Sequence, residues 1–267
     1  MASIRSTGPT LLDGAMGTAL QARGLPEGAL PEEWLLTRPE EIAAVHGAHA
    51  AAGARILLSC TFNCASERPA RRGVHASLLE LCTRALALAR RSVPLTQVAG
   101  ALGPGDAGAP GRYREAFRAL AGAGADLLWA ESQREPAEAR AALAAAHESR
   151  LRVVVTLSPD EREGKLVLPR GEDPAALLRE LAANGAEAVG VNCVFLGPAL
   201  ERLLAELAGT LPVPLVVKAS AGLPGTVLSP EEWAAGMARL AGLGADWVGG
   251  CCGASPAHLA ALGLRLG

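Results

Sequence analysis

The chain has 267 residues, half of them hydrophobic, which is enough for one large α/β barrel or for two small domains. Its 25 basic and 27 acidic residues leave a net charge of −2, which offers no electrostatic surface for nucleic acid or an anionic membrane. The apolar stretches are short, and the N-terminus lacks the hydrophobic segment of a secretory signal. We therefore expect a cytoplasmic protein with reduced cysteines.

Short aliphatic runs recur along the chain, and a longer segment rich in Ala and Leu follows each of them. Eight runs predict strands: Thr10–Asp13, Arg55–Cys60, Gln97–Leu102, Asp126–Glu131, Arg152–Leu157, Ala188–Cys193, Pro214–Ser220 and Asp246–Cys251. Helical spacing predicts eight helices between and after them: Pro39–Ala52, Val74–Arg91, Arg112–Leu120, Ala137–Ser149, Pro174–Asn184, Pro198–Ala208, Pro230–Leu243 and Pro256–Leu264. Five of these helices begin with Pro, which suits the first turn.

A Gly-Ala pair separates a predicted helix from the next strand at four places, namely Gly53-Ala54, Gly124-Ala125, Gly185-Ala186 and Gly244-Ala245. Glycine there suits the left-handed residue that ends a helix. Eight strand–helix units in roughly 250 residues predict a (β/α)8 TIM barrel. A doubly wound open sheet is the alternative, but it usually has fewer strands. No linker divides the chain, so we expect one domain over residues 1–267.

Three cysteines stand at predicted strand ends. Cys193 ends the sixth strand, and Cys251 and Cys252 end the eighth. The carboxyl ends of barrel strands form one face, where active sites lie, and strands six and eight flank strand seven. Neighbouring residues of a strand point to opposite faces, so Cys251 and Cys252 can share a ligand only if the chain leaves extended geometry. The glycines in Gly249-Gly-Cys-Cys-Gly253 allow this.

Three thiolates with an open fourth position are typical of a catalytic zinc site. Bound zinc keeps thiolates deprotonated, and an incoming thiol would lose its proton and become a nucleophile. Two simpler interpretations compete with this one. Cys193 alone could be a small buried hydrophobic residue, and the adjacent Cys251 and Cys252 could be a coincidence or a strained disulfide.

The chain resembles the homocysteine S-methyltransferase family, the zinc-dependent domain of cobalamin-dependent methionine synthase and of the betaine and S-methylmethionine enzymes. The motifs that carry this resemblance are Leu12-Asp-Gly-Ala-Met-Gly-Thr18, Cys60-Thr-Phe-Asn63, Gly100-Ala-Leu-Gly-Pro104, Gly190-Val-Asn-Cys193, Ala221-Gly-Leu-Pro224 and Gly249-Gly-Cys-Cys-Gly253. The resemblance implies a (β/α)8 barrel that binds zinc through Cys193, Cys251 and Cys252.

The implied reaction is methyl transfer to the thiol of homocysteine, which forms methionine. The donor stays open in the sequence. S-methylmethionine or a partner protein carrying methylcobalamin is favoured, because the chain contains no cobalamin-binding or folate-binding module. Methyltetrahydrofolate used directly and betaine are further possibilities. Neither nucleic acid nor a membrane is expected as a partner.

The resemblance also implies a substrate site. Asp13 and Glu131 would hold the homocysteine ammonium group, and backbone amides would hold its carboxylate. From the residues alone, Asp13 could equally be a helix cap and Glu131 half of a structural salt bridge. The full predicted set of substrate contacts is Asp13, Gly14, Ala15, Met16, Gly17, Thr18, Glu131, Thr61, Asn192 and Ser220.

The sequence departs from the family at two positions. The family often has Asn before Ala-Gly-Leu-Pro, close enough to occupy the open metal position when no thiol is bound, but Ser220 stands here. Because a serine side chain is shorter, we expect water to fill that gap. Cys60 stands where the family usually has Asn.

Two other functions are compatible with parts of the pattern. One is a barrel that binds zinc or thiols without catalysis. The other is a lyase or aldolase, which needs a Lys or His at a strand end, and Lys218 is the candidate for that role. We expect His46 and His49 to lie on the outer ring of helices, solvated or capping and away from the site.

Overall fold

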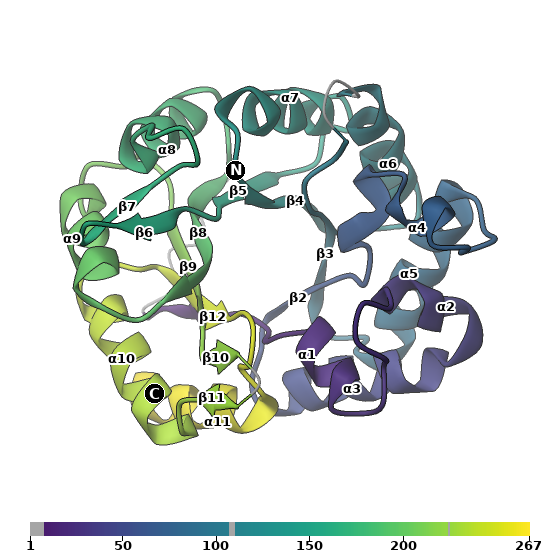
Figure 1. Cartoon of the computed structure of the whole chain (residues 1–267), viewed down its shortest axis with the longest axis horizontal. Coiled ribbons are helices and arrows are strands. Elements are labelled where there is room, and N and C mark those ends of the chain that lie inside the picture. Colours follow the sequence, from purple (N-terminus) through teal and green to yellow (C-terminus); the bar gives the residue numbers. More distant parts are fainter. Residues whose placement is uncertain (1–7, 107–109, 224) are drawn as a thin grey trace.

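Eight parallel strands form a ring surrounded by helices in the computed structural model, which describes residues 8–106, 110–223 and 225–267 (Figure 1). In order around the ring, the strands are β1 (Thr10–Leu11), β12 (Trp247–Gly250), β9 (Leu215–Ser220), β8 (Ala188–Phe195), β5 (Val153–Leu157), β4 (Leu127–Gln133), β3 (Gln97–Leu102) and β2 (Ile56–Leu58). A parallel bridge between Leu12 and Ile56 joins the two ends of this order. The predicted (β/α)8 barrel is confirmed. Pro224, at the end of one predicted motif, lies outside the described residues.

Helices alternate with the strands and cover the outside of the ring (Figure 1). The long ones are α3 (Pro39–Ala51), α5 (Leu78–Ser92), α6 (Pro110–Gly122), α7 (Pro136–His147), α8 (Pro174–Ala183), α9 (Pro198–Leu207), α10 (Pro230–Gly242) and α11 (Pro256–Leu266). Each agrees with a predicted helix to within a few residues. The four glycines of the Gly-Ala pairs have φ between 92° and 107°, which confirms the predicted left-handed helix ends.

Several short elements were not predicted from the sequence. They are the helices α1 (Gly17–Gln21), α2 (Trp34–Thr37) and α4 (Arg68–Arg71), the 3-10 turns η1 (Pro31–Glu33) and η2 (Phe62–Ala65), and two hairpins, β6–β7 (Asp160–Arg162, Lys165–Val167) and β10–β11 (Gly222–Leu223, Thr226–Val227). Segments of two to five residues are too short for a periodic pattern to reveal. Most of them belong to the loops that follow the barrel strands, where they help to shape the pocket described below.

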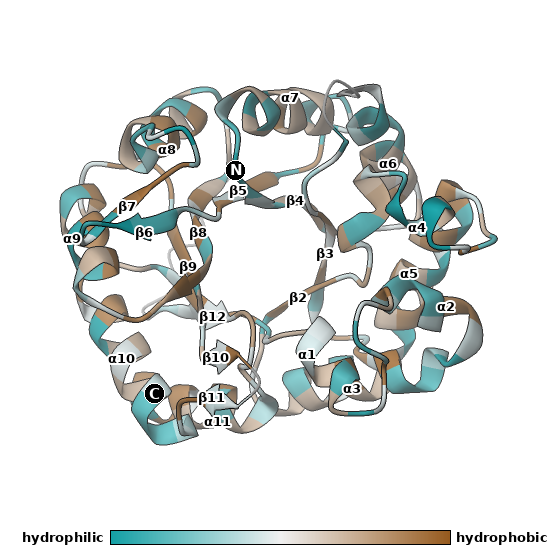
Figure 2. Cartoon of the chain, viewed as in Figure 1, coloured by the Kyte–Doolittle hydropathy of each residue, from teal (hydrophilic) through white to brown (hydrophobic). Residues whose placement is uncertain are grey.

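The hydrophobic core has two parts. A large cluster fills the space between the strands and the helices, and a smaller one, which includes Trp129 and Trp247, fills the inside of the ring. In Figure 2 the apolar residues accordingly concentrate on the strands and on the inner sides of the helices. The carboxyl ends of the strands lie at the edge of this packed interior. No helix in the described part of the chain is long and apolar enough to cross a membrane.

Candidate active site

The three predicted cysteines converge at the carboxyl ends of β8 and β12, on either side of β9. The sulfurs of Cys193, Cys251 and Cys252 all lie within 4.8 Å of one another, and those of Cys193 and Cys251 are 2.7 Å apart. Among the described residues, no other group of three His, Cys, Asp or Glu side chains is arranged to hold a metal ion. Hydrogen bonds from Cys193 and Cys251 lower the pKa of the Cys252 thiol, whereas the pKa values of Cys193 and Cys251 are raised, so the arrangement favours a thiolate at Cys252.

The pair Cys251 and Cys252 is held by backbone hydrogen bonds to the strand between the two cysteine-bearing strands. The Cys251 amide donates to the Ala219 carbonyl at 3.0 Å, and the Cys252 carbonyl accepts from the Ala221 amide at 2.8 Å. β12 ends at Gly250, so both cysteines lie in the turn that follows it. The departure from extended geometry that the sequence predicted is therefore present, and it lets neighbouring residues face one another.

Two of the glycines around the cysteine pair are required, each for a different reason. Gly253 has φ of 76°, and a Cβ there would lie 2.6 Å from the Gly222 carbonyl oxygen. Gly250 has an ordinary φ, but a Cβ there would lie 2.3 Å from the Cβ of Ala254. Gly253 is thus required for its conformation and Gly250 for close packing.

Cys193 reaches the cluster through strained backbone. It has φ of 56°, and the pairing of β8 with β9 shifts register between Asn192 and Val194. Ser132 on β4 also has φ of 56°, beside a register shift in β4. A non-glycine residue in this region costs about 1–3 kcal/mol, and such strain persists where the surroundings impose it. The two irregular strands together turn the Cys193 sulfur toward Cys251.

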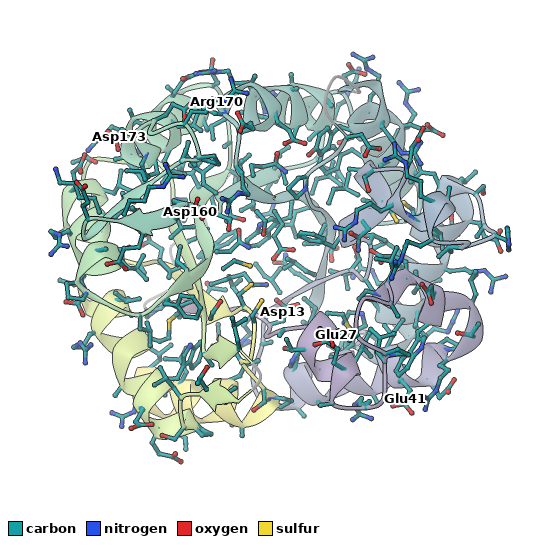
Figure 3. All side chains as sticks on the ribbon, viewed as in Figure 1. Asp13, Glu27, Glu41, Asp160, Arg170 and Asp173 are labelled. Carbon is teal, nitrogen blue, oxygen red and sulfur yellow. The ribbon has the colours of Figure 1, made fainter. Side chains whose placement is uncertain are left out.

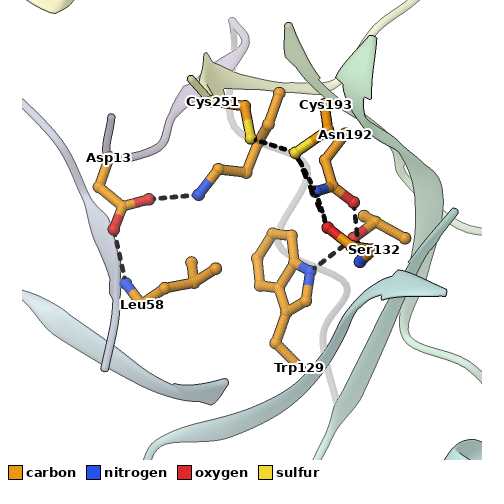
Figure 4. Close-up of polar contacts among 9 residues, drawn as sticks. Asp13, Leu58, Trp129, Ser132, Asn192, Cys193 and Cys251 are labelled. Atoms are coloured by element: carbon orange, nitrogen blue, oxygen red, sulfur yellow. Dashed lines mark hydrogen bonds and ion pairs between the residues drawn. The ribbon is translucent and has the colours of Figure 1, made fainter. Parts of the chain in front are cut away.

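A hydrogen-bonded network stabilises this arrangement (Figure 4). The Asn192 side chain accepts from the Ser132 amide at 3.0 Å and donates to the Ser132 hydroxyl and, at 3.5 Å, to the Cys193 sulfur. The Ser132 hydroxyl lies 3.8 Å from the same sulfur. Asn192 and Ser132 therefore position Cys193 and can donate hydrogen bonds to its thiolate. Ser132 could not be predicted, because neither its residue type nor its spacing indicates a left-handed conformation.

The cysteines form part of the wall of a pocket of about 550 Å³. Near them the wall contains residues 13–18, Glu131, Ser132 and Lys218. A further part of the wall comes from the loops after β1 and β2, namely from residues 29–32, Cys60, Phe62, Asn63 and Arg68. A pocket of this size takes a small metabolite and leaves room for a second molecule beside it.

Two carboxylates and one ammonium group lie at the barrel's centre. Lys218 on β9 is buried, and its Nζ lies 2.5 Å from Oδ1 of Asp13. The other oxygen of Asp13 accepts from the Leu58 amide at 2.8 Å (Figure 4). Figure 3 shows Asp13 inside the ring, whereas Glu41 lies at its outer edge. Asp13 is not a helix cap, since the residue before α1 is Met16.

The charges in this group shift one another's protonation. Burial raises the pKa of Glu131 to about 7, although the positive charge of Lys218 opposes the rise. Burial on its own would lower the pKa of Lys218, but Asp13 and then Glu131 outweigh it and raise that pKa above its usual value. A Schiff-base nucleophile must be a neutral amine. The ion pair with Asp13 therefore argues against the lyase or aldolase alternative.

The other predicted substrate contacts divide into two groups. Gly14, Ala15, Met16, Gly17 and Thr18 all line the pocket. The Ala15 amide already donates to the Ala254 carbonyl at 3.1 Å, and the Thr18 hydroxyl accepts from the Gly253 amide. Free amides for a substrate carboxylate must therefore come from other residues of this loop.

Thr61, Asn192 and Ser220 are buried and do not line the pocket. The Thr61 hydroxyl donates to the Ala101 carbonyl, so it holds β3 rather than facing a ligand. Asn192 acts on Cys193 as described above. Cys60, one of the two departures from the family pattern, does line the pocket, although its side chain is only 3% exposed.

His46 and His49 lie on a helix of the outer ring, as expected, but the expectation that they are solvated or capping is wrong. Both are fully buried on α3, and the ring nitrogens of both have no hydrogen-bond partner among the described residues. Burial lowers the pKa of His46 to about 4, so it is neutral. The sequence did carry a signal, because both histidines share a helix face with Ile42 and Val45. His49 packs under the pocket loop, against Gly14.

Comparison with known proteins identifies a family. Residues 10–266 match the family described as homocysteine S-methyltransferase. The homocysteine S-methyltransferase of Escherichia coli (strain K12) is 33% identical, over 96% of this chain and 94% of its own length. The methionine synthase of Mycobacterium tuberculosis is 29% identical over 92% of this chain, which spans only 24% of that enzyme.

Solved structures agree with these relatives. The metallated form of the homocysteine methyltransferase MmuM from Escherichia coli matches with a TM-score of 0.79 and 28% identity, covering 97% of both chains. The carboxyl transferase domain of Rhizobium etli pyruvate carboxylase matches with a TM-score of 0.60 at 18% identity, which shows a shared fold alone.

Proposed function

The chain belongs to the homocysteine S-methyltransferase family, and on that premise we propose that it methylates the thiol of homocysteine in the cysteine-lined pocket, forming methionine. The observation that carries this proposal is the convergence of three thiols from two separate strands on one pocket that also contains Glu131. A protein that only binds zinc would have no need for a carboxylate and a cavity beside its thiols. The catalytic function is therefore favoured over the scaffold.

The donor set supports zinc as the metal. Three thiolates suit its borderline softness and leave one position open. Zinc–sulfur bonds of about 2.3 Å place tetrahedral ligands roughly 3.8 Å apart. The sulfurs of Cys193 and Cys251 are 2.7 Å apart and would have to separate by about 1 Å to match this spacing. When bound, zinc would supply the charge that keeps a substrate thiol deprotonated at neutral pH.

The chain's own residues orient the substrate. We propose that Glu131 receives the ammonium group of homocysteine and that the loop of residues 14–18 receives its carboxylate. Both lie in the same pocket as the cysteines, so an amino acid held by them can direct its sulfur toward the cluster. Fixing the nucleophile in this way supports an in-line approach to the methyl donor.

A part of the pocket wall away from the cysteines is suited to a small cationic donor that carries a carboxylate. Arg68 on α4 lines this part; its guanidinium attracts the buried Glu32 carboxylate but forms no hydrogen bond and no ion pair within 4.0 Å with any described residue. Phe62 is the aromatic residue of the wall, and aromatic faces attract cationic methyl groups. We therefore favour S-methylmethionine as the donor. A partner protein that carries methylcobalamin is the second candidate, because the chain also resembles part of methionine synthases.

The test is a methyl-transfer assay combined with metal analysis. The purified protein is assayed with homocysteine and, in separate reactions, S-methylmethionine, betaine, methyltetrahydrofolate and a methylcobalamin-carrying protein. We expect methionine from the first reaction and about one zinc per chain. Cys252→Ala should lose both, whereas Cys82→Ala, which removes a buried thiol from the core cluster, should keep both. A wild type without zinc, or an active Cys252→Ala variant, would overturn the proposal.

A further inference from the structure

Lys218 places an ammonium group of the protein where the family resemblance places that of the substrate. Its Nζ is 2.5 Å from Asp13, and the side chains of Lys218 and Asp13 are 3% and 5% exposed. Glu131 also attracts Lys218 and is part of the same pocket wall. The two carboxylates expected to share the substrate ammonium are therefore not equivalent, because one of them already has a cationic partner.

The hydrogen bonds show the same difference. Each oxygen of Asp13 has a protein donor, Lys218 on one side and the Leu58 amide on the other. The carboxylate of Glu131, by contrast, forms no hydrogen bond and no ion pair within 4.0 Å with any residue in the described ranges. A partly exposed carboxylate in a pocket, with no donor of its own, is free to receive the ammonium group of a ligand. Glu131 is thus the carboxylate that lacks a partner.

Charge balance leads to the same assignment. With both carboxylates ionised, Asp13, Lys218 and Glu131 carry a net charge of −1, which one substrate ammonium neutralises. Without Lys218 the net charge would be −2 in a buried site, and the ligand would leave one charge uncompensated.

We propose that Lys218 is a positioning residue that neutralises Asp13, so that Glu131 alone receives the substrate ammonium directly. Asp13 then acts by holding Lys218 and the end of β2 through Leu58. This inference rests on the proposed function, because it assumes that the ligand is homocysteine. It departs from the family-based expectation, in which Asp13 contacts the substrate itself.

The test compares binding of two thiols to the zinc-loaded protein by calorimetry. L-homocysteine carries the ammonium group, and 4-mercaptobutanoate is the same thiol without it. We expect the wild type to prefer homocysteine by at least about tenfold, as for a charge-assisted hydrogen bond. Glu131→Gln should lose most of this preference. The double variant Asp13→Asn/Lys218→Met should retain it within about threefold, since no direct ligand has been removed.

Thermal unfolding without ligand provides a second readout. Each single variant, Asp13→Asn or Lys218→Met, leaves one buried charge unpaired, so each should have a lower Tm than the double variant. Lys218→Arg should preserve the preference for homocysteine, because it keeps the charge.

The outcomes distinguish failure of this inference from failure of the proposed function. A double variant that binds both thiols equally, while Glu131→Gln still prefers homocysteine, would show that Asp13 is the direct contact and overturn the inference. Additive losses of Tm in the single and double variants would also count against it. A wild type that binds neither thiol would overturn the proposed function and this inference with it.

Discussion

At the scale of single residues, the site depends on side chains whose surroundings alter their chemistry. Glu131 is the clearest case, because burial raises its pKa to about 7. Its carboxylate therefore changes charge within the range in which the enzyme is expected to work. The affinity for a ligand that binds through an ammonium group should therefore depend on pH.

We predict that the affinity for the product, L-methionine, increases about tenfold between pH 6 and pH 8, because ionised Glu131 binds the ammonium group and the protonated form does not. Rising pH has the opposite effect on the stability of the fold. The folded protein retains this proton when the unfolded chain, with its usual pKa of 4.5, has lost it, so Glu131 lowers stability as pH rises from 4.5 to about 7. Calorimetric titration of the wild type and Glu131→Gln tests the binding, and a flat wild-type profile would refute it.

Asn192 should affect the metal although it is not a ligand. Its amide donates to the Cys193 sulfur and holds the strained Ser132 amide. Asn192→Ala should therefore weaken zinc binding by about 10–100-fold, the usual effect of removing a partner of a metal ligand. Competition with a chelator measures this, and Asn184→Ala, at the exposed residue that follows α8, serves as the matched control. Equal zinc affinities in the two variants would contradict the role given to Asn192.

At the scale of elements, the eight strands, the eight long helices and the strand order were readable from the sequence, because each spans enough residues for apolar periodicity to appear. The convergence of the cysteines followed from that order together with the glycines of residues 249–253. The left-handed conformation of Cys193 and Ser132 was not readable. It results from register shifts in two separate strands, which only tertiary packing imposes. The ion pair of Asp13 with Lys218 was missed for a similar reason, since it joins residues from opposite ends of the chain.

Gly250, the last residue of β12, should tolerate no added side chain. A Cβ there would meet Ala254 at 2.3 Å, so Gly250→Ala should cost about 1–3 kcal/mol of unfolding free energy. Gly47 lies in the middle of α3 with open space around it, and Gly47→Ala should stabilise the protein by about 0.5–1 kcal/mol. Urea unfolding of both variants measures the difference. A Gly250→Ala variant as stable as the wild type would show that the turn can move.

At the scale of the whole molecule, the barrel brings loops that are distant in sequence together around one cavity, in which we propose that substrate and donor meet. In the proposed function, Glu131 and the loop of residues 14–18 hold homocysteine, and the more distant part of the wall, which contains Phe62 and Arg68, faces the donor. Arg68 connects this arrangement to donor choice, because it is the cation of that part of the wall and forms no hydrogen bond or ion pair within 4.0 Å through its guanidinium with any described residue, although it attracts Glu32.

If Arg68 binds the donor carboxylate, Arg68→Gln should raise KM for S-methylmethionine about tenfold and leave KM for homocysteine unchanged. Arg71→Gln is the matched control, since Arg71 belongs to the same short helix but pairs with Glu67 and does not line the pocket. Steady-state kinetics with each substrate varied separates the two effects. Equal KM values for S-methylmethionine in both variants would remove Arg68 from the donor site.

The most direct test of the central claim is X-ray absorption at the zinc edge, measured on the zinc-loaded protein with and without homocysteine. Three cysteine sulfurs at about 2.3 Å with one lighter neighbour are expected before homocysteine is added, and four sulfurs afterwards. A spectrum that homocysteine does not change, or one with fewer than three sulfur neighbours at the start, would contradict a thiol-activating site built from Cys193, Cys251 and Cys252.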